Sequence, residues 1–170
     1  MSGPSPPSPP ERELTGDALV EYLRQSFSLV PLHSLLDLRF LPAQPEMVVV
    51  EMPVREEAFN QSGNLHGGAI ATLIDVACGS AAARSSTFEP GRNTMVTADL
   101  HVRYLGRPKT DLVRAEARLM RAGRQLIVVE CRVVDTLDNV IAFADFSAMI
   151  VPLREPLRPS EQADVRAPDL

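Results

Sequence analysis

The amino-acid sequence predicts an α+β domain in which a curved antiparallel β-sheet is wrapped around one long central helix. Three observations carry this prediction. One helix, entered through a polar turn at 60–64 and continuing to Ser85, consists almost entirely of aliphatic or very small residues. Two strand-like runs precede it, and four longer ones follow it. A sheet with one apolar face must bury that face, and this helix is the element that can cover it.

The segment ahead of the central helix is predicted to contain one helix and two strands. Apolar residues recur at helical spacing from Leu19 to Phe27, and Pro31 interrupts this helix before a short second turn at 33–36. Valine and other aliphatic residues dominate the two runs after it. The strands are expected at 38–41 and 47–54, joined by a turn at 42–45.

Asp75 is the most unusual residue of the central helix. The helix is apolar all round, which predicts a buried helix, and its three glycines each cost about 1 kcal/mol relative to alanine. These glycines therefore require a packing or functional reason. An isolated ionised carboxylate is very costly to bury, so Asp75 is expected either to have hydrogen-bond partners or to line a site.

The four runs after the helix are predicted to form an antiparallel meander. Alternation is clear in the first run, where the even-numbered residues from Val96 to Tyr104 would share one face. The connections are short and rich in turn residues, as hairpins require. The strands are expected at 94–105, 112–121, 125–135 and 140–151, with turns at 106–108, 122–124 and 137–139.

Length and composition indicate one globular domain of 170 residues with 45% hydrophobic residues. The predicted boundaries are a Pro-rich tail at 1–13, the domain at 14–151 and a second tail at 152–170. The net charge of −5 argues against nucleic acid as a partner. No secretory signal or membrane span is visible, so a soluble, cytoplasmic protein is expected. Cys78 and Cys131 form no CxxC pair and are expected to be core residues, and no metal-ligand spacing exists.

A motif around the start of the central helix resembles a known family. It consists of Asn60, the run Gly63-Asn64-Leu65-His66-Gly67-Gly68, and Asp75 eight positions after Gly67. It resembles the hotdog-fold acyl-CoA thioesterases of the phenylacetate-pathway (PaaI-like) group. The resemblance covers roughly residues 32–151 and extends to Thr97-Ala98-Asp99-Leu100 and to Tyr104-Leu105-Gly106-Arg107-Pro108. It implies two sheets joined edge to edge in a dimer, often paired into a tetramer, and a site at the subunit interface without metal or cofactor.

The resemblance also implies a role for individual residues. Asp75 matches the catalytic carboxylate, which acts as a general base on water or as a nucleophile on the thioester. Gly67 matches the residue whose N–H faces the thioester oxygen, at a helix N-terminus that favours developing negative charge. His66 and Asn60 match polar residues that fix the substrate or the entry loop. Thr97 matches a serine or threonine that positions water near the carboxylate.

Each of these residues also has a structural explanation. Asp75 could be a satisfied structural carboxylate, and Gly67 could be needed only for close packing. His66 and Asn60 suit a helix cap and a turn, and threonine is favoured in any strand. The hairpin residues Arg121, Gly123 and Arg124 are expected to contact the CoA moiety, since resembling proteins often place this hairpin near the nucleotide. Exposed hairpin arginines are, however, more often solvated surface.

Helical geometry separates two of the predicted site residues. Nine positions at about 100° each place His66 and Asp75 on opposite faces of an ideal helix. If both belong to one site, two chains must build it. The sequence therefore favours a homodimer or homotetramer.

The predicted function is hydrolysis of acyl-CoA or aryl-CoA thioesters. One alternative is a hotdog hydratase or dehydratase, but no second carboxylate–histidine pair accompanies the helix start. Another is a non-catalytic acyl-CoA-binding or sensor protein on the same fold. Retention of Asp75 together with the His66-Gly67-Gly68 turn argues against the sensor.

Overall fold

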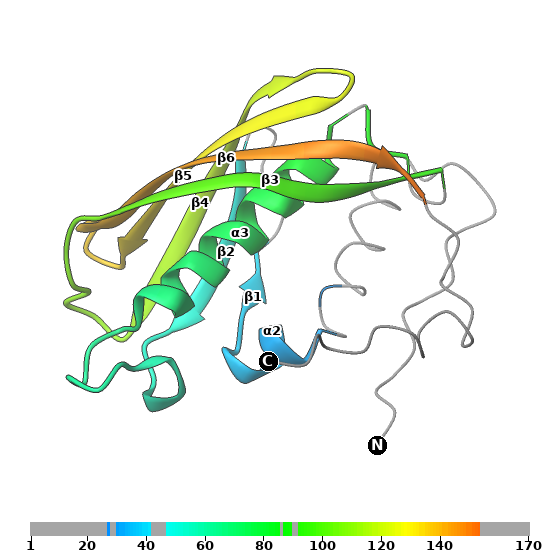
Figure 1. Cartoon of the computed structure of the whole chain (residues 1–170). Helices are drawn as coiled ribbons and strands as arrows, with labels where there is room; N and C mark the ends of the chain where they lie inside the picture. The colour runs from blue at the N-terminus through cyan, green and yellow to red at the C-terminus, as the bar shows by residue number, and fades with distance from the viewer. Residues whose placement is uncertain (1–26, 28–29, 42–46, 86, 90–91, 154–170) are drawn as a thin grey trace, which may run out of the picture.

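The computed structural model describes residues 27, 30–41, 47–85, 87–89 and 92–153. One long helix, α3, lies against a curved six-stranded antiparallel sheet (Figure 1). The strand order is β1-β2-β4-β5-β6-β3. The predicted architecture is confirmed, and its elements are α2 (Pro31–Leu35), β1 (Arg39–Phe40), β2 (Met47–Pro53), a 3-10 turn (Glu56–Ala58), α3 (Gly67–Ala83), β3 (Asn93–Tyr104), β4 (Leu112–Ala122), β5 (Leu126–Asp135) and β6 (Val140–Pro152).

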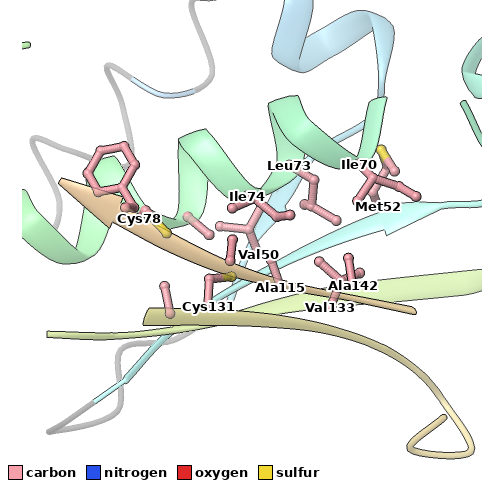
Figure 2. Close-up of a cluster of buried hydrophobic side chains, with 14 of the residues drawn as sticks. Val50, Met52, Ile70, Leu73, Ile74, Cys78, Ala115, Cys131, Val133 and Ala142 are labelled. Atoms are coloured by element: carbon pink, nitrogen blue, oxygen red, sulfur yellow. The ribbon is translucent and has the colours of Figure 1, made fainter. Parts of the chain in front are cut away.

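The hydrophobic core fills the space between α3 and the sheet. Ile70, Leu73 and Ile74 point from the helix toward the strands (Figure 2). Small residues on the sheet, including Ala115 and Ala142, allow the helix to lie close to it. Burying an aliphatic side chain of this size contributes about 1.5–3 kcal/mol, so this layer holds the helix in place.

The helix is not buried on all sides, contrary to the prediction from its apolar composition. The half-buried residues recur every three to four positions and so form one face of α3. The sheet covers only the opposite face of α3. Around Gly79, an added Cβ atom would meet no atom within 4 Å, so no contact within the described chain requires this glycine. The half-buried residues of this face are Gly67, Ala71, Thr72, Asp75, Val76, Gly79 and Ser80.

The predicted four-strand meander is wrong, because β3 pairs with β6 and not with β4. The segment after β3 is a crossover that passes over the ends of β6 and β5. The N–H groups of Leu105 and Gly106 donate to the Ile141 carbonyl at 2.8 and 3.1 Å. A Cβ atom on Gly106 would lie 3.2 Å from the Val140 carbonyl oxygen, which explains the glycine. The sequence between β3 and β4 is short and rich in turn residues, which suits a hairpin and a crossover equally, so the sequence pattern did not distinguish the two.

Asp135 ties this crossover to the β5–β6 hairpin. Its buried carboxylate accepts hydrogen bonds from the backbone N–H groups of Lys109, Leu137 and Asn139 and from the Asn139 side-chain amide, at 2.9–3.0 Å. Burial raises the pKa of this carboxyl, but these donors outweigh burial and bring the pKa to about 2.

Other predicted segments agree with the structure or lie outside its described part. The strand boundaries agree to within about two residues, and Pro31 begins a short helix at its first position. The tail at 1–13, the turn at 42–45, the tail after 153 and nearly all of the helix before Pro31 lie outside the described residues. No helix among the described residues combines the length and apolarity that crossing a membrane requires.

The two cysteines are buried free thiols in the core, as predicted. Cys78 lies on α3 and Cys131 on β5, between the helix and the sheet (Figure 2). A hydrogen bond with Cys131, together with burial, raises the pKa of the Cys78 thiol. Both thiols therefore act as small core side chains.

Candidate active site

Asp75 and Thr97 meet between the central helix and the edge strand. The Thr97 hydroxyl donates a hydrogen bond of 2.9 Å to Oδ1 of Asp75. Asp75 lies on the half-buried face of α3, and Thr97 is exposed in the single chain. The carboxylate therefore has a donor partner and still faces accessible space.

A β-bulge in β3 turns Thr97 toward the helix. The register shifts between Thr97 and Asp99, so Ala98 is the extra residue. Thr97 pairs with the buried Ala148 and shares its face, whereas an unbroken alternation would have pointed Thr97 away from α3. The predicted common face from Val96 to Tyr104 is therefore wrong at its first two positions.

The same bulge separates His101 from Thr97. Both residues have odd numbers, so an unbroken alternation would put them on one face, but His101 pairs with Asp145 on the other side of the sheet. Its Nδ1 lies 3.9 Å from Oδ2 of Asp145, which Arg103 also contacts at 3.3 Å. His101 thus belongs to an exposed charged cluster away from Asp75.

The start of α3 presents a free backbone donor. His66 is the N-cap residue, and its Nδ1 accepts the Gly68 N–H at 2.8 Å. An imidazole that accepts at Nδ1 carries its proton on Nε2. Gly67 is the first helical residue, and within the described chain its N–H donates to no acceptor. This N–H and the helix dipole together favour a negatively charged oxygen at this point.

Asn60 organises the loop that leads into α3. Its Oδ1 accepts the N–H groups of Ser62 at 2.9 Å and Asn64 at 3.2 Å, and Gly63 provides the positive φ of +69° that the turn requires. Within the described residues Asn60 makes no hydrogen bond to Asp75. In one chain Thr97, and not Asn60, is therefore the side-chain donor to this carboxylate.

One chain does not bring the Gly67 N–H and the Asp75 carboxylate to a common point. The two residues are eight positions apart in the helix, which is about 12 Å along the axis at 1.5 Å per residue. A base and an oxyanion donor must both lie about 3 Å from the reacting atoms. If both groups belong to one site, each chain presents two half-sites, one at Asp75 and one at Gly67.

The hairpin with Arg121, Gly123 and Arg124 lies at the other end of the sheet from the helix start (Figure 1). Both arginines are exposed, and neither makes an ion pair with a described residue. Gly123 has a steric reason, because its N–H donates to the Leu126 carbonyl at 2.9 Å and an added Cβ would lie 2.7 Å from that oxygen.

A cavity of about 530 Å³ lies between the C-terminal end of α3 and the strands β2 and β4. Its lining includes Met47, Ala81 and Arg84 but neither Asp75 nor Gly67. We locate the candidate site instead at Asp75, with its Thr97 partner, and at the start of α3, with the Gly67 N–H. Across the described chain, no group of three or more His, Cys, Asp or Glu side chains is placed to hold a metal ion.

Tyr104 also contacts the candidate site, which the sequence did not predict. Its hydroxyl donates to the Gly67 carbonyl at 3.0 Å. The alternation of β3 placed Tyr104 on the helix side, but no sequence signal indicated which residue it would meet.

Comparisons with known proteins show which family the chain resembles. The sequence profile of the thioesterase superfamily matches residues 62–142. "Putative esterase SSO2140" of Saccharolobus solfataricus is 31% identical over 100 residues, which are 59% of this chain and 69% of that protein. Acyl-coenzyme A thioesterase 13 of Mus musculus is 32% identical over 85 residues, which are 49% of this chain and 58% of that protein.

Solved structures show the same fold. The crystal structure of a mutant of thioesterase PA1618 from Pseudomonas aeruginosa superposes with a TM-score of 0.72 and 26% identity, covering 82% of this chain and 97% of that one. The chain spans about six tenths of the length of the curated relatives that it matches. The predicted hotdog fold is confirmed, while the phenylacetate-pathway group stays a prediction. The chain belongs to the thioesterase superfamily.

Proposed function

We propose that the protein hydrolyses acyl-CoA or aryl-CoA thioesters to the free acid and CoA. The observation that carries this proposal is the Asp75 carboxylate held by the Thr97 hydroxyl at 2.9 Å, in a chain of the thioesterase superfamily. A carboxylate in this setting can accept a proton from water. The name of the murine relative, acyl-coenzyme A thioesterase 13, supports CoA esters as the substrate class.

In the proposed reaction, water between Asp75 and Thr97 attacks the carbonyl carbon of the thioester. Asp75 takes the proton of this water, and the Gly67 N–H donates to the oxygen that becomes negative. When the tetrahedral intermediate collapses, the C–S bond breaks, and CoA leaves as a thiol that carries the proton returned by Asp75. Direct attack of Asp75 to form an anhydride, which water then hydrolyses, is the second route that the same residues allow.

We propose that two chains build each site. The outer edge of β3 pairs with no described strand over its 12 residues, and proteins normally protect so long an edge. Edge-to-edge pairing with a second copy covers this strand. The proposed site then combines Asp75 of one chain with Gly67 of the partner subunit, and His66 and Asn60 fix the substrate and the entry loop beside that Gly67.

For the CoA moiety we propose Arg121 and Arg124 as phosphate contacts around the tight turn at Gly123. Arginine forms charge-assisted, often bidentate hydrogen bonds with phosphate. The hairpin lies far from the Gly67 of its own chain, so the nucleotide is expected to contact a different copy from the one whose Gly67 holds the thioester oxygen.

A thiol-release assay over short, long and aromatic acyl-CoAs tests the proposed function. Release of CoA that depends on Asp75 supports hydrolysis and identifies the acyl group. Acyl-CoA binding without release would instead indicate a sensor. Formation of a hydroxyacyl-CoA from an enoyl-CoA, with the thioester intact, would indicate a hydratase.

A further inference from the structure

We infer that Tyr104 is a positioning residue that holds the Gly67–Gly68 peptide beside the proposed oxyanion donor, the Gly67 N–H, an inference that rests on the proposed function. Tyr104 ends β3, the strand whose Thr97 contacts Asp75. Its hydroxyl donates to the Gly67 carbonyl at 3.0 Å. The edge strand thus holds the helix at two points, one at each half-site.

The contact holds one particular peptide unit. The Gly67 carbonyl and the Gly68 N–H belong to the same planar peptide. Tyr104 donates to its oxygen at 3.0 Å, while Nδ1 of His66 accepts from its nitrogen at 2.8 Å. Two side chains from different elements therefore fix both ends of one plane.

This restraint matters because the peptide joins two glycines. Glycine has the widest choice of backbone angles, so the sequence alone leaves this turn loose. Rotation of the Gly67–Gly68 peptide changes ψ of Gly67 and φ of Gly68. The Gly67 N–H belongs to the preceding peptide, so the contact acts on this donor by holding Gly67 itself in place. An oxyanion donor is effective only when its direction is set before the reaction.

The ring of Tyr104 also lies against the position where a Cβ atom of residue 67 would be. An added Cβ on Gly67 would lie 3.4–3.5 Å from the Cζ, Cε1 and Oη atoms of Tyr104. The ring therefore packs directly over the helix start, although the side chain is 53% exposed overall. Hydroxyl and ring can be tested separately.

Tyr104→Phe removes the hydroxyl and keeps the ring. We expect kcat to fall roughly three- to tenfold, the size of one net hydrogen bond, with KM for acyl-CoA within about twofold of wild type. Ser80→Ala is the matched control, since it removes a hydroxyl-to-carbonyl hydrogen bond of 2.8 Å elsewhere on α3 and should leave kcat unchanged.

Double-mutant cycles test the shared peptide. Tyr104→Phe combined with His66→Ala should lose less than the product of the two single losses, since both side chains hold the same plane. Tyr104→Phe combined with Thr97→Val should multiply to within about a factor of two, because Thr97 acts at the other half-site. Multiplicative behaviour of the first pair would overturn the inference.

Hydrogen–deuterium exchange of the segment around Gly67 and Gly68 separates this inference from the proposed function. Faster exchange there in Tyr104→Phe, and not in Ser80→Ala, is expected. Wild-type kcat with wild-type exchange would refute the role of Tyr104 and leave the thioesterase proposal intact. A wild-type protein that hydrolyses no acyl-CoA would refute both the proposed function and the effect of Tyr104 on kcat. The exchange data would then decide whether Tyr104 restrains the Gly67–Gly68 peptide.

Discussion

Replacing Asp75 with asparagine removes the proposed base and little else. The amide keeps an oxygen where the Thr97 hydroxyl donates at 2.9 Å, so the contact between α3 and β3 survives. A hydrogen bond to a charged acceptor is worth about 1 kcal/mol more than one to a neutral acceptor, which bounds the loss of stability. Loss of a general base costs a hundredfold or more in rate, about 2.7 kcal/mol or above. The expected effect on turnover is therefore too large to arise from folding.

The assay is steady-state release of CoA thiol from a good acyl-CoA substrate. We expect Asp75→Asn to lower kcat at least a hundredfold while substrate still binds. Asp75→Glu keeps the carboxylate and should retain partial activity. The matched control is Asp99→Asn, which removes the same charge from an exposed residue two positions beyond Thr97. Near-wild-type turnover in Asp75→Asn would remove this carboxylate from the mechanism and favour the sensor.

Three further predictions concern Thr97, the β4–β5 hairpin and Asp135. Thr97→Val should lower kcat roughly three- to tenfold, less than Asp75→Asn, because in the proposed mechanism Thr97 orients the water and Asp75 activates it. A loss as large as that of Asp75→Asn, or larger, would contradict this order. Arg121→Gln with Arg124→Gln should raise KM for acyl-CoA at least threefold and leave kcat nearly unchanged; an unchanged KM would exclude the hairpin. Asp135→Asn should lower the melting temperature at neutral pH. The pKa of Asp135 is about 2 in the folded protein, below the ordinary 3.8. Its stabilisation is therefore complete above pH 3.8 and is lost as the pH falls through about 2. The melting temperatures of wild type and Asp135→Asn should converge at that low pH.

The sequence predicted the elements well because their patterns are local. The small-residue helix and the β-rich runs around it have periodicities that do not depend on the rest of the fold. Strand order is not local. The connection at 105–111 has the residues of a hairpin, and its role as a crossover depends on contacts to Ile141 and Asp135 that are distant in sequence.

The candidate site was predictable as a set of residues but not as a geometry. The motif indicated Asp75, Gly67 and Thr97, yet alternation along β3 would have pointed Thr97 away from the helix. The bulge at Ala98 reverses its direction, and nothing in the local sequence marks that bulge. The contact between Tyr104 and Gly67 joins residues 37 positions apart and was equally beyond a reading by pattern.

The central claim is that two chains share one thioesterase site, and Gly67→Pro offers a direct test. Proline is well tolerated at the first position of a helix, where it removes an N–H that the helix does not use. His66 already has the extended backbone (φ −68°, ψ 134°) that a following proline requires. Gly67→Ala is the matched control, because it adds the Cβ at ordinary contact distance and keeps the N–H.

The decisive measurement is the activity of a mixed dimer, purified through two different tags, that contains one Gly67→Pro chain and one Asp75→Asn chain. Each variant alone should be nearly inactive, because both of its sites lack one group. In the mixed dimer one site combines an intact Gly67 with an intact Asp75 from the other chain, so roughly half of the wild-type activity should return. A mixed dimer as inactive as its parents would contradict a site shared between chains.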